Sequence, residues 1–194
     1  MMPVDAIVVA GGSGRRLGGA DKASIAIGAQ TLLQRALAAV ADADRIVVVG
    51  PDRQLPSSVV GVSEQPPGGG PAAAVVAGLA RVAKPFVVVL ACDMPFVTAA
   101  HVHRLRRAVD ASGRPGLDGA TYVDRDGRRQ LLAAIYRAES LRHSARVFCK
   151  VTGLSMRALT NGLTLLECKG DSLVSLDCDT WDDVAVSREL LEEA

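Results

Sequence analysis

A glycine-rich loop follows the apolar segment 6–10, with five glycines in nine residues. Glycine carries no Cβ and tolerates positive φ, so such a loop can fold around a ligand with several backbone N–H groups pointing inward. Arg15, Arg16 and Lys22 add positive charge to the same stretch. This combination predicts an anion site and suits the phosphates of a nucleotide. The glycines are Gly11, Gly12, Gly14, Gly18 and Gly19.

Two familiar nucleotide-binding motifs do not fit this loop. The dinucleotide motif GxGxxG needs a third glycine where Leu17 stands, and the Walker A loop needs Gly-Lys-Ser/Thr where the chain has residues 20–22. The loop therefore has a motif of a third kind, AGGxxxRLGGxDK over residues 10–22. The competing interpretation is an ordinary turn between a strand and a helix.

Asp93 directly follows the wholly apolar segment 86–92. A buried strand at this place would carry the carboxylate to the edge of a sheet, and Pro95 disfavours helical geometry at Met94. Carboxylate oxygens beside phosphates are ordinary ligands of Mg²⁺. We therefore predict that Asp93 binds Mg²⁺; the alternative is that it only caps the next helix.

Two further carboxylates, Asp177 and Asp179, follow the apolar segment 173–176, which we predict to be a late strand. Residues two apart on an extended segment point to the same face. One of the pair is therefore expected to complete the metal site, while the other caps the last helix through Thr180. The residues alone leave open which of the two completes the metal site. The alternative is that both carboxylates only cap the helix.

A second glycine loop has the sequence PPGGGP at residues 66–71. It precedes a helix of small residues and allows another close approach of the backbone to a ligand. We predict that Gly68 and Gly70 contact the base or ribose of a nucleotide.

Apolar runs alternate with helical patterns along the chain, which is typical of a doubly wound α/β fold with a mostly parallel sheet. Ligands of such folds bind outside the carboxyl ends of the strands. A hairpin turn is expected at residues 124–127. The predicted strands are 6–10, 45–49, 59–62, 86–91, 120–123, 131–136, 163–168 and 173–176, and the predicted helices are 31–41, 72–82, a basic helix after Thr98, 138–149, 154–160 and 182–193.

Composition narrows the possible partners and compartments. The chain has 194 residues without a low-complexity linker, so we expect one domain over residues 1–194. Its net charge of +1 gives no sign of a nucleic-acid partner. The apolar run 86–92 is too short to span a membrane, and no cationic region precedes the first apolar segment. The four cysteines have no metal-type spacing, so we expect reduced thiols and a cytoplasmic protein.

These motifs together resemble the molybdenum cofactor guanylyltransferase (MobA-like) family of NTP transferases. The resemblance covers nearly the whole chain and rests on motifs in the family's order. It implies the three-layer α/β/α sandwich of nucleotide-diphosphosugar transferases, and an activity that joins a nucleotide to the terminal phosphate of molybdopterin with release of pyrophosphate. The motifs are AGGxxxRLGGxDK from Ala10, PGGGP from Pro67, CDMPF from Cys92, DGRRQLLAAIYR from Asp126 and LDCDTWDDV from Leu176.

The resemblance also implies roles for the matching residues. Arg16 and Lys22 would hold the triphosphate and, with Asp93, would be catalytic. Gly50 and Glu64 would stand near the base or ribose. Mg²⁺ would be the cofactor, bound by Asp93 and Asp177. The full nucleotide site would contain Val9, Ala10, Gly11, Gly12, Arg16, Lys22, Gly50, Glu64, Gly68, Gly70 and Asp93.

Three departures from the family pattern concern the substrates. Glu64 replaces the usual Asp, Ala72 and Ala73 replace Leu-Ala, and Trp181 replaces Pro. The phosphate and metal residues remain, so we expect GTP and molybdopterin as substrates, with transient contacts to molybdenum cofactor biosynthesis proteins or to chaperones of molybdoenzymes. The alternatives are a CTP-dependent cytidylyltransferase or a sugar-phosphate nucleotidyltransferase on the same fold, and a nucleotide-binding module without turnover.

Overall fold

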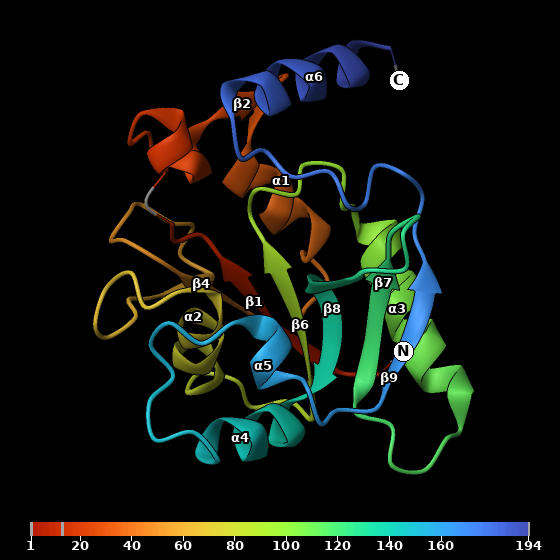
Figure 1. Cartoon of the computed structure of the whole chain (residues 1–194). Helices are drawn as coiled ribbons and strands as arrows, with labels where there is room; N and C mark the ends of the chain where they lie inside the picture. Colours follow the sequence, from red (N-terminus) through yellow and green to blue (C-terminus); the bar gives the residue numbers. More distant parts are fainter. Residues whose placement is uncertain (1, 13, 194) are drawn as a thin grey trace.

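A computed structural model describes residues 2–12 and 14–193, and its centre is a seven-stranded sheet (Figure 1). The strand order is β5-β4-β1-β6-β8-β7-β9. Only β8 runs antiparallel to its neighbours among these strands, so the predicted, mostly parallel α/β sheet is confirmed. The strands are β1 (Val4–Val9), β4 (Arg45–Val49), β5 (Val59–Val62), β6 (Phe86–Ala91), β7 (Gly119–Val123), β8 (Arg129–Arg137) and β9 (Leu165–Lys169).

The central strands are apolar except for Asp5, because both faces of the sheet are covered; the Asp5 carboxylate accepts hydrogen bonds from the N–H groups of Ala83 and Lys84. Every residue of β1 and β6 is buried. Side chains alternate between the faces, so Ala6 and Val8 join one core cluster while Ile7 and Val9 join the other. The first cluster lies against α1 (Leu32–Ala39) and α3 (Ala99–Ser112), and the second lies against α2 (Pro71–Leu79), α4 (Ala138–Arg146) and α5 (Met156–Leu159).

A third, smaller core joins the two ends of the chain above the sheet. The last helix, α6 (Trp181–Glu192), lies over the two-stranded sheet of β2 (Ala26–Ile27) and β3 (Gln30–Thr31) in Figure 1. Arg188 donates two hydrogen bonds to the carbonyl oxygen of Ala26, at 3.0 and 3.1 Å. This packing brings the start of α6 next to the glycine-rich loop. The buried residues of the third core are Leu17, Ile25, Ile27, Leu32, Cys178 and Val184.

The predicted strand at residues 173–176 is wrong, because these residues form a turn. The Asp171 carboxylate accepts hydrogen bonds from the backbone N–H groups of Leu173 and Val174, at 3.0 and 3.1 Å. An aspartate that bonds to the backbone two residues further on favours a turn over a strand. Val174 is buried in the core, which explains the apolar pattern without a strand.

Several predicted boundaries also shift. The strand predicted at 163–168 is β9 and begins two residues later, while the helices predicted at 138–149 and 154–160 shorten to α4 and α5. The helix predicted at 31–41 is α1, with Thr31 as its N-cap. Among the described residues, no helix combines the length and the apolar character that crossing a membrane requires.

Candidate active site

Backbone hydrogen bonds close the loop after β1 on itself. The N–H groups of Leu17 and Gly19 both donate to the carbonyl oxygen of Gly14, at 2.8 and 2.9 Å. Gly14 has a φ of 51°, and a Cβ at this position would lie 2.2 Å from the carbonyl oxygen of Ala20. A side chain there would therefore force the loop open. Leu17 ends the short 3-10 helix η1 (Arg15–Leu17) and anchors the loop in the third core.

Four charged side chains from distant parts of the sequence meet beside this loop. Lys22 lies in the 3-10 helix η2 (Lys22–Ser24), and its Nζ donates to Oδ2 of Asp93 at 3.1 Å. The same ammonium forms a short hydrogen bond with Oδ1 of Asp179. Nη1 of Arg16 lies 3.0 Å from the other carboxylate oxygen of Asp179. The structure thus brings Arg16, Lys22 and Asp93 together, as their predicted shared site requires.

Lys22 is held in its charged form. Burial lowers its pKa, but the hydrogen bond to Asp179 and the charge and hydrogen bond of Asp93 outweigh burial, so the net pKa is raised. Its side chain is 17% exposed, whereas that of Arg16 is 72% exposed. Lys22 is therefore a largely covered positive charge at the base of the site, and Arg16 is a solvent-exposed charge at its rim, held by Asp179.

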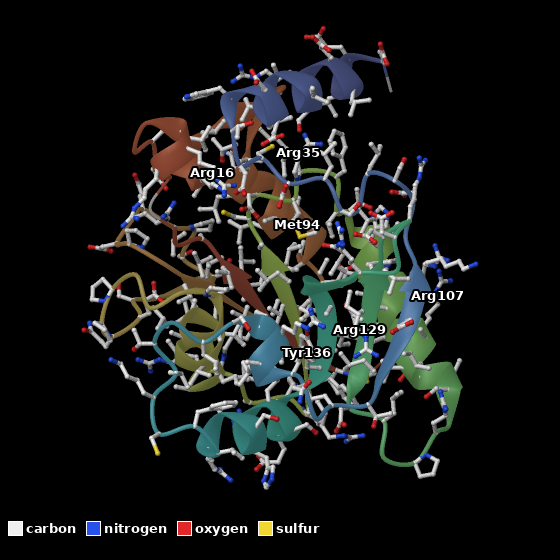
Figure 2. All side chains as sticks on the ribbon, viewed as in Figure 1. Arg16, Arg35, Met94, Arg107, Arg129 and Tyr136 are labelled. Atoms are coloured by element: carbon white, nitrogen blue, oxygen red, sulfur yellow. The ribbon has the colours of Figure 1, made fainter. Side chains whose placement is uncertain are left out.

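The loop and these charges surround an open cavity of about 300 Å³. Figure 2 shows Arg16 at this place, between the sheet and α6. A larger cavity of about 670 Å³ lies beside α4 and α5, around Asp118 and His143. We place the candidate site in the smaller cavity because it gathers backbone N–H groups and cations suited to an anion. Its lining residues are Gly11, Gly12, Gly14, Arg15, Arg16, Lys22 and Asp179.

Asp93 stands at the carboxyl end of β6, as predicted. The N–H of Cys92 donates to the carbonyl oxygen of Val9 at 3.0 Å and extends the pairing of β6 with β1 past the last strand residue. The N–H of Cys178 donates to the carbonyl oxygen of Asp93 at 2.9 Å. This bond fixes the segment before α6 against the tip of β6, and the Asp179 carboxylate of this segment reaches Lys22 and Arg16.

The carboxylates of this segment divide their roles differently from the prediction. Asp179 contacts Lys22, while Thr180 and Asp183 form the capping box of α6, so neither member of the predicted pair supplies the helix cap. Burial raises the pKa of Asp177, and the negative charges of Asp179 and Asp93 raise it further. Asp177 therefore lies within the electrostatic reach of both other carboxylates.

No three His, Cys, Asp or Glu side chains form a group that could hold a metal ion in the part of the chain that the structure describes. Mg²⁺ requires fewer protein ligands, because it keeps several waters and takes one or two carboxylates together with substrate phosphates. Asp93 and Asp177 offer that number of carboxylates, and Asp177 is close enough to Asp93 and Asp179 for their charges to add to the effect of burial in raising its pKa. Their assignment to Mg²⁺ stays a prediction.

Glu64 links the two glycine loops. Its side chain is buried after β5, with Oε1 accepting a hydrogen bond from the N–H of Gly68 at 3.0 Å. The other oxygen, Oε2, is buried without a hydrogen-bond partner among the described residues. A Cβ at Gly11 would lie 3.7 Å from Oε1, and one at Gly69 would lie 3.5 Å from Oε2. A buried, unpaired carboxylate oxygen is costly unless a ligand donates to it.

The remaining predicted nucleotide residues lie around these loops. Val9 is the buried end of β1, and Ala10 continues the pairing by donating to the carbonyl oxygen of Val49 at 2.8 Å. Gly50 packs so closely on this turn that a Cβ would lie 2.6 Å from the carbonyl oxygen of Ala10. Gly70 is the N-cap of α2.

Arg53 belongs to the same region and was not predicted. Its guanidinium donates to the carbonyl oxygen of Ala10 at 3.0 Å and to the Asp21 carboxylate at 3.1 Å. In the sequence Arg53 stands in a loop after β4, and no spacing distinguishes it from the other arginines. The partner of Arg53 is easier to find in the sequence, because Asp21 directly precedes Lys22 in the loop motif.

A mostly parallel sheet with a glycine loop, cations and carboxylates at its carboxyl edge is the arrangement typical of nucleotide-binding α/β proteins. Residues 6–161 match the model of the MobA-like NTP transferase domain. The chain therefore belongs to the MobA-like NTP transferase family and is a nucleotidyltransferase.

Curated relatives agree with this assignment. The chain is 31% identical over 133 residues to a molybdenum cofactor guanylyltransferase of Cupriavidus pinatubonensis, covering 66% of each protein. It is 34% identical over 147 residues to a probable molybdenum cofactor guanylyltransferase of Mycobacterium tuberculosis, covering 71% of this chain and 70% of the relative. The matched segments thus span about two thirds of these relatives.

Solved structures share the fold. Molybdopterin-guanine dinucleotide biosynthesis protein A from Archaeoglobus fulgidus superposes with a TM-score of 0.76 at 19% identity, over 98% of this chain and 100% of that chain. 2-C-methyl-D-erythritol 4-phosphate cytidylyltransferase from Thermus thermophilus gives a TM-score of 0.70 at 20% identity, with the same coverage. The fold is therefore that of α/β nucleotidyltransferases.

Proposed function

We propose that this chain transfers GMP from GTP to the terminal phosphate of molybdopterin and releases pyrophosphate. The curated relatives named guanylyltransferases support both substrates. The cytoplasm is the compartment we propose for this reaction. Proteins that make the cofactor or hand it to molybdoenzymes are the transient partners we propose.

The unpaired Oε2 of Glu64 is the observation that carries the choice of GTP. Guanine presents two neighbouring donors on one edge, its N1–H and its N2 amino group, whereas cytosine presents a single donor group. A carboxylate with one free oxygen and a second that accepts from Gly68 at 3.0 Å suits the guanine edge. Gly11 and Gly69 place backbone beside this carboxylate, since a Cβ at Gly11 would lie 3.7 Å from Oε1 and one at Gly69 would lie 3.5 Å from Oε2.

The charges of the site suit the transfer step. An oxygen of the acceptor phosphate attacks the α-phosphorus of GTP in line, and the bond between the α-phosphorus and the bridging oxygen breaks. Negative charge then develops on the leaving pyrophosphate. Lys22 and Arg16 neutralise this charge from positions fixed before the reaction, which is how a preorganised site lowers the barrier.

A magnesium ion held by Asp93 and Asp177 would neutralise phosphate charge and polarise the bonds around the α-phosphorus. Asp179 has a different role in this scheme, because its carboxylate pairs with both cations that we assign to the triphosphate. Binding of the triphosphate then requires Asp179 to give up these contacts. It keeps Arg16 and Lys22 ordered until the substrate arrives.

Nucleotide choice is tested by measuring the melting temperature of the protein with Mg²⁺ and each of GTP, CTP, ATP and UTP at equal concentration. The tighter ligand stabilises more by mass action, so GTP is expected to give the largest shift. The variant Glu64→Gln should lose this preference. A larger shift with CTP would favour a cytidylyltransferase instead, and a preference kept in Glu64→Gln would remove Glu64 from the base site.

A further inference from the structure

Arg53 connects three separate segments at the base of the glycine loop. Nη2 donates to the carbonyl oxygen of Ala10 at 3.0 Å, and Nη1 lies 3.1 Å from Oδ2 of Asp21. Nη2 also reaches Oδ1 of Asp21 at 3.4 Å, and Nε reaches the carbonyl oxygen of Pro51 at 3.4 Å. The Arg53 side chain is 12% exposed and that of Asp21 is 49% exposed, so the guanidinium is largely covered while the carboxylate stays open to solvent.

The Asp21 carboxylate transmits this connection to Lys22. Besides the bond from Arg53, the carboxylate accepts a hydrogen bond from Oγ of Ser24 at 2.7 Å. The backbone carbonyl oxygen of Asp21 accepts a second bond from the N–H of Ser24 at 3.0 Å. These bonds shape η2, whose first residue is Lys22. The end of β1 and the start of η2 are therefore tied to one guanidinium, and the intervening loop spans between them.

Arg53 does not line the cavity beside the glycine loop, whose cations are Arg15, Arg16 and Lys22 among the described residues. Its guanidinium is paired with the Asp21 carboxylate and borders a separate cavity of about 350 Å³ on the side of Ala23 and Thr31. A lysine could not replace it, because a single ammonium lacks the planar fork that meets a carboxylate and a carbonyl at once.

We propose that Arg53 is a positioning residue for nucleotidyl transfer, an inference that rests on the proposed function. By fixing Asp21 and the carbonyl of Ala10, it sets the distance between the backbone N–H groups of the loop and the ammonium of Lys22. Both groups must face the same triphosphate, and a displacement of about 1 Å can cost roughly 10²-fold in rate.

The test compares Arg53→Ala, Arg53→Lys, Asp21→Asn and the double variant Arg53→Ala/Asp21→Asn with the wild-type protein. Arg53→Ala should lower kcat for pyrophosphate release about 10²-fold, with a smaller change in KM for GTP. Methylguanidinium added to Arg53→Ala should restore part of kcat, and Arg53→Lys should stay impaired. Because both residues act through one contact, the double variant should be no slower than the slower single variant.

Arg45 provides the matched control, since its guanidinium bonds the carbonyl oxygen of Arg81 at the other end of β4. Arg45→Ala should keep wild-type kinetics. Normal kcat in Arg53→Ala would overturn the proposal. A rise in KM for GTP without a fall in kcat would also overturn the proposal, because it would make Arg53 a direct ligand of the nucleotide. So would a double variant whose loss of kcat equals the product of the two single losses, because the two residues would then act independently.

A second measurement separates this proposal from the proposed function. Backbone hydrogen exchange of residues 14–24 needs no substrate, and it should accelerate in Arg53→Ala and in Asp21→Asn but not in Arg45→Ala. Faster exchange in a wild-type-like fold without any GMP transfer would contradict the proposed reaction and leave the positioning role standing. Unchanged exchange would refute the positioning role whatever the substrate.

Discussion

Replacing Lys22 by methionine removes the ammonium that lies between Asp93 and Asp179 while keeping an aliphatic side chain of similar length. Two consequences follow. The leaving pyrophosphate loses its fixed positive charge, and the two carboxylates lose the cation that they share. The first should reduce turnover, and the second should change the affinity for Mg²⁺ and the stability.

The magnitudes follow from the burial of the ammonium. The Lys22 side chain is 17% exposed and preorganised by two carboxylates, and loss of one preorganised donor costs about 10²–10³-fold in kcat, or about 3–4 kcal/mol. The effect on unfolding should be smaller. Because the Asp179 side chain is 40% exposed, we expect the loss of this ion pair to cost no more than about 1 kcal/mol.

The assay follows pyrophosphate release at saturating GTP and acceptor, together with urea unfolding of the same preparation. Lys22→Arg serves as the control that keeps the charge, and it should retain more activity than Lys22→Met. Turnover of Lys22→Met within a few fold of wild type would refute the assignment of this loop to the triphosphate. A large loss of stability would show that Lys22 is mainly structural.

Three further changes test other parts of the site. Asp93→Asn should lower Mg²⁺-dependent turnover at least about 10²-fold and raise the Mg²⁺ concentration needed for activity. The free energy of unfolding should change by less than about 1 kcal/mol. A normal rate at low Mg²⁺ would place the metal elsewhere. Glu64→Gln should weaken GTP binding about 10-fold or more in calorimetry, with little effect on CTP binding. The reason is that the amide presents one acceptor and one donor group where guanine offers two donors. Equal losses of affinity for both nucleotides would refute the base contact. Gly14→Ala should destabilise the protein by about 1–3 kcal/mol in urea unfolding, because of its φ of 51° and the 2.2 Å approach of a Cβ to Ala20; unchanged stability would mean that the loop has another conformation.

The strands of the parallel sheet were predictable because their burial on both faces leaves a continuous apolar run. The bounds of β4, β5 and β6 agree with the prediction, whereas the segment 173–176 was mistaken for a strand. A short apolar run does not distinguish a strand from a turn that buries one of its side chains in the core. Val174 is such a side chain. The capping by Asp171 that decides the outcome lies before the run.

The convergence of Lys22 with Asp93 was predictable from topology, since the ends of parallel strands meet at one edge of the sheet. The place of Asp179 was not, because it depends on how α6 packs over the loop. Arg53 was missed for a similar reason: its contacts with Ala10 and Asp21 depend on the path of a loop that carries no motif. The roles of all these residues in catalysis stay predictions.

The identity of the reaction is tested most directly by following the phosphates of GTP. The protein is incubated with Mg²⁺, molybdopterin and GTP labelled at either the α- or the γ-phosphate. The products are then separated and identified by mass spectrometry. GMP transfer predicts that the α-label appears in a molybdopterin guanine dinucleotide and the γ-label in pyrophosphate, with no transfer when CTP replaces GTP. Transfer from CTP alone, or a γ-label released as inorganic phosphate without any dinucleotide, would contradict the proposed reaction.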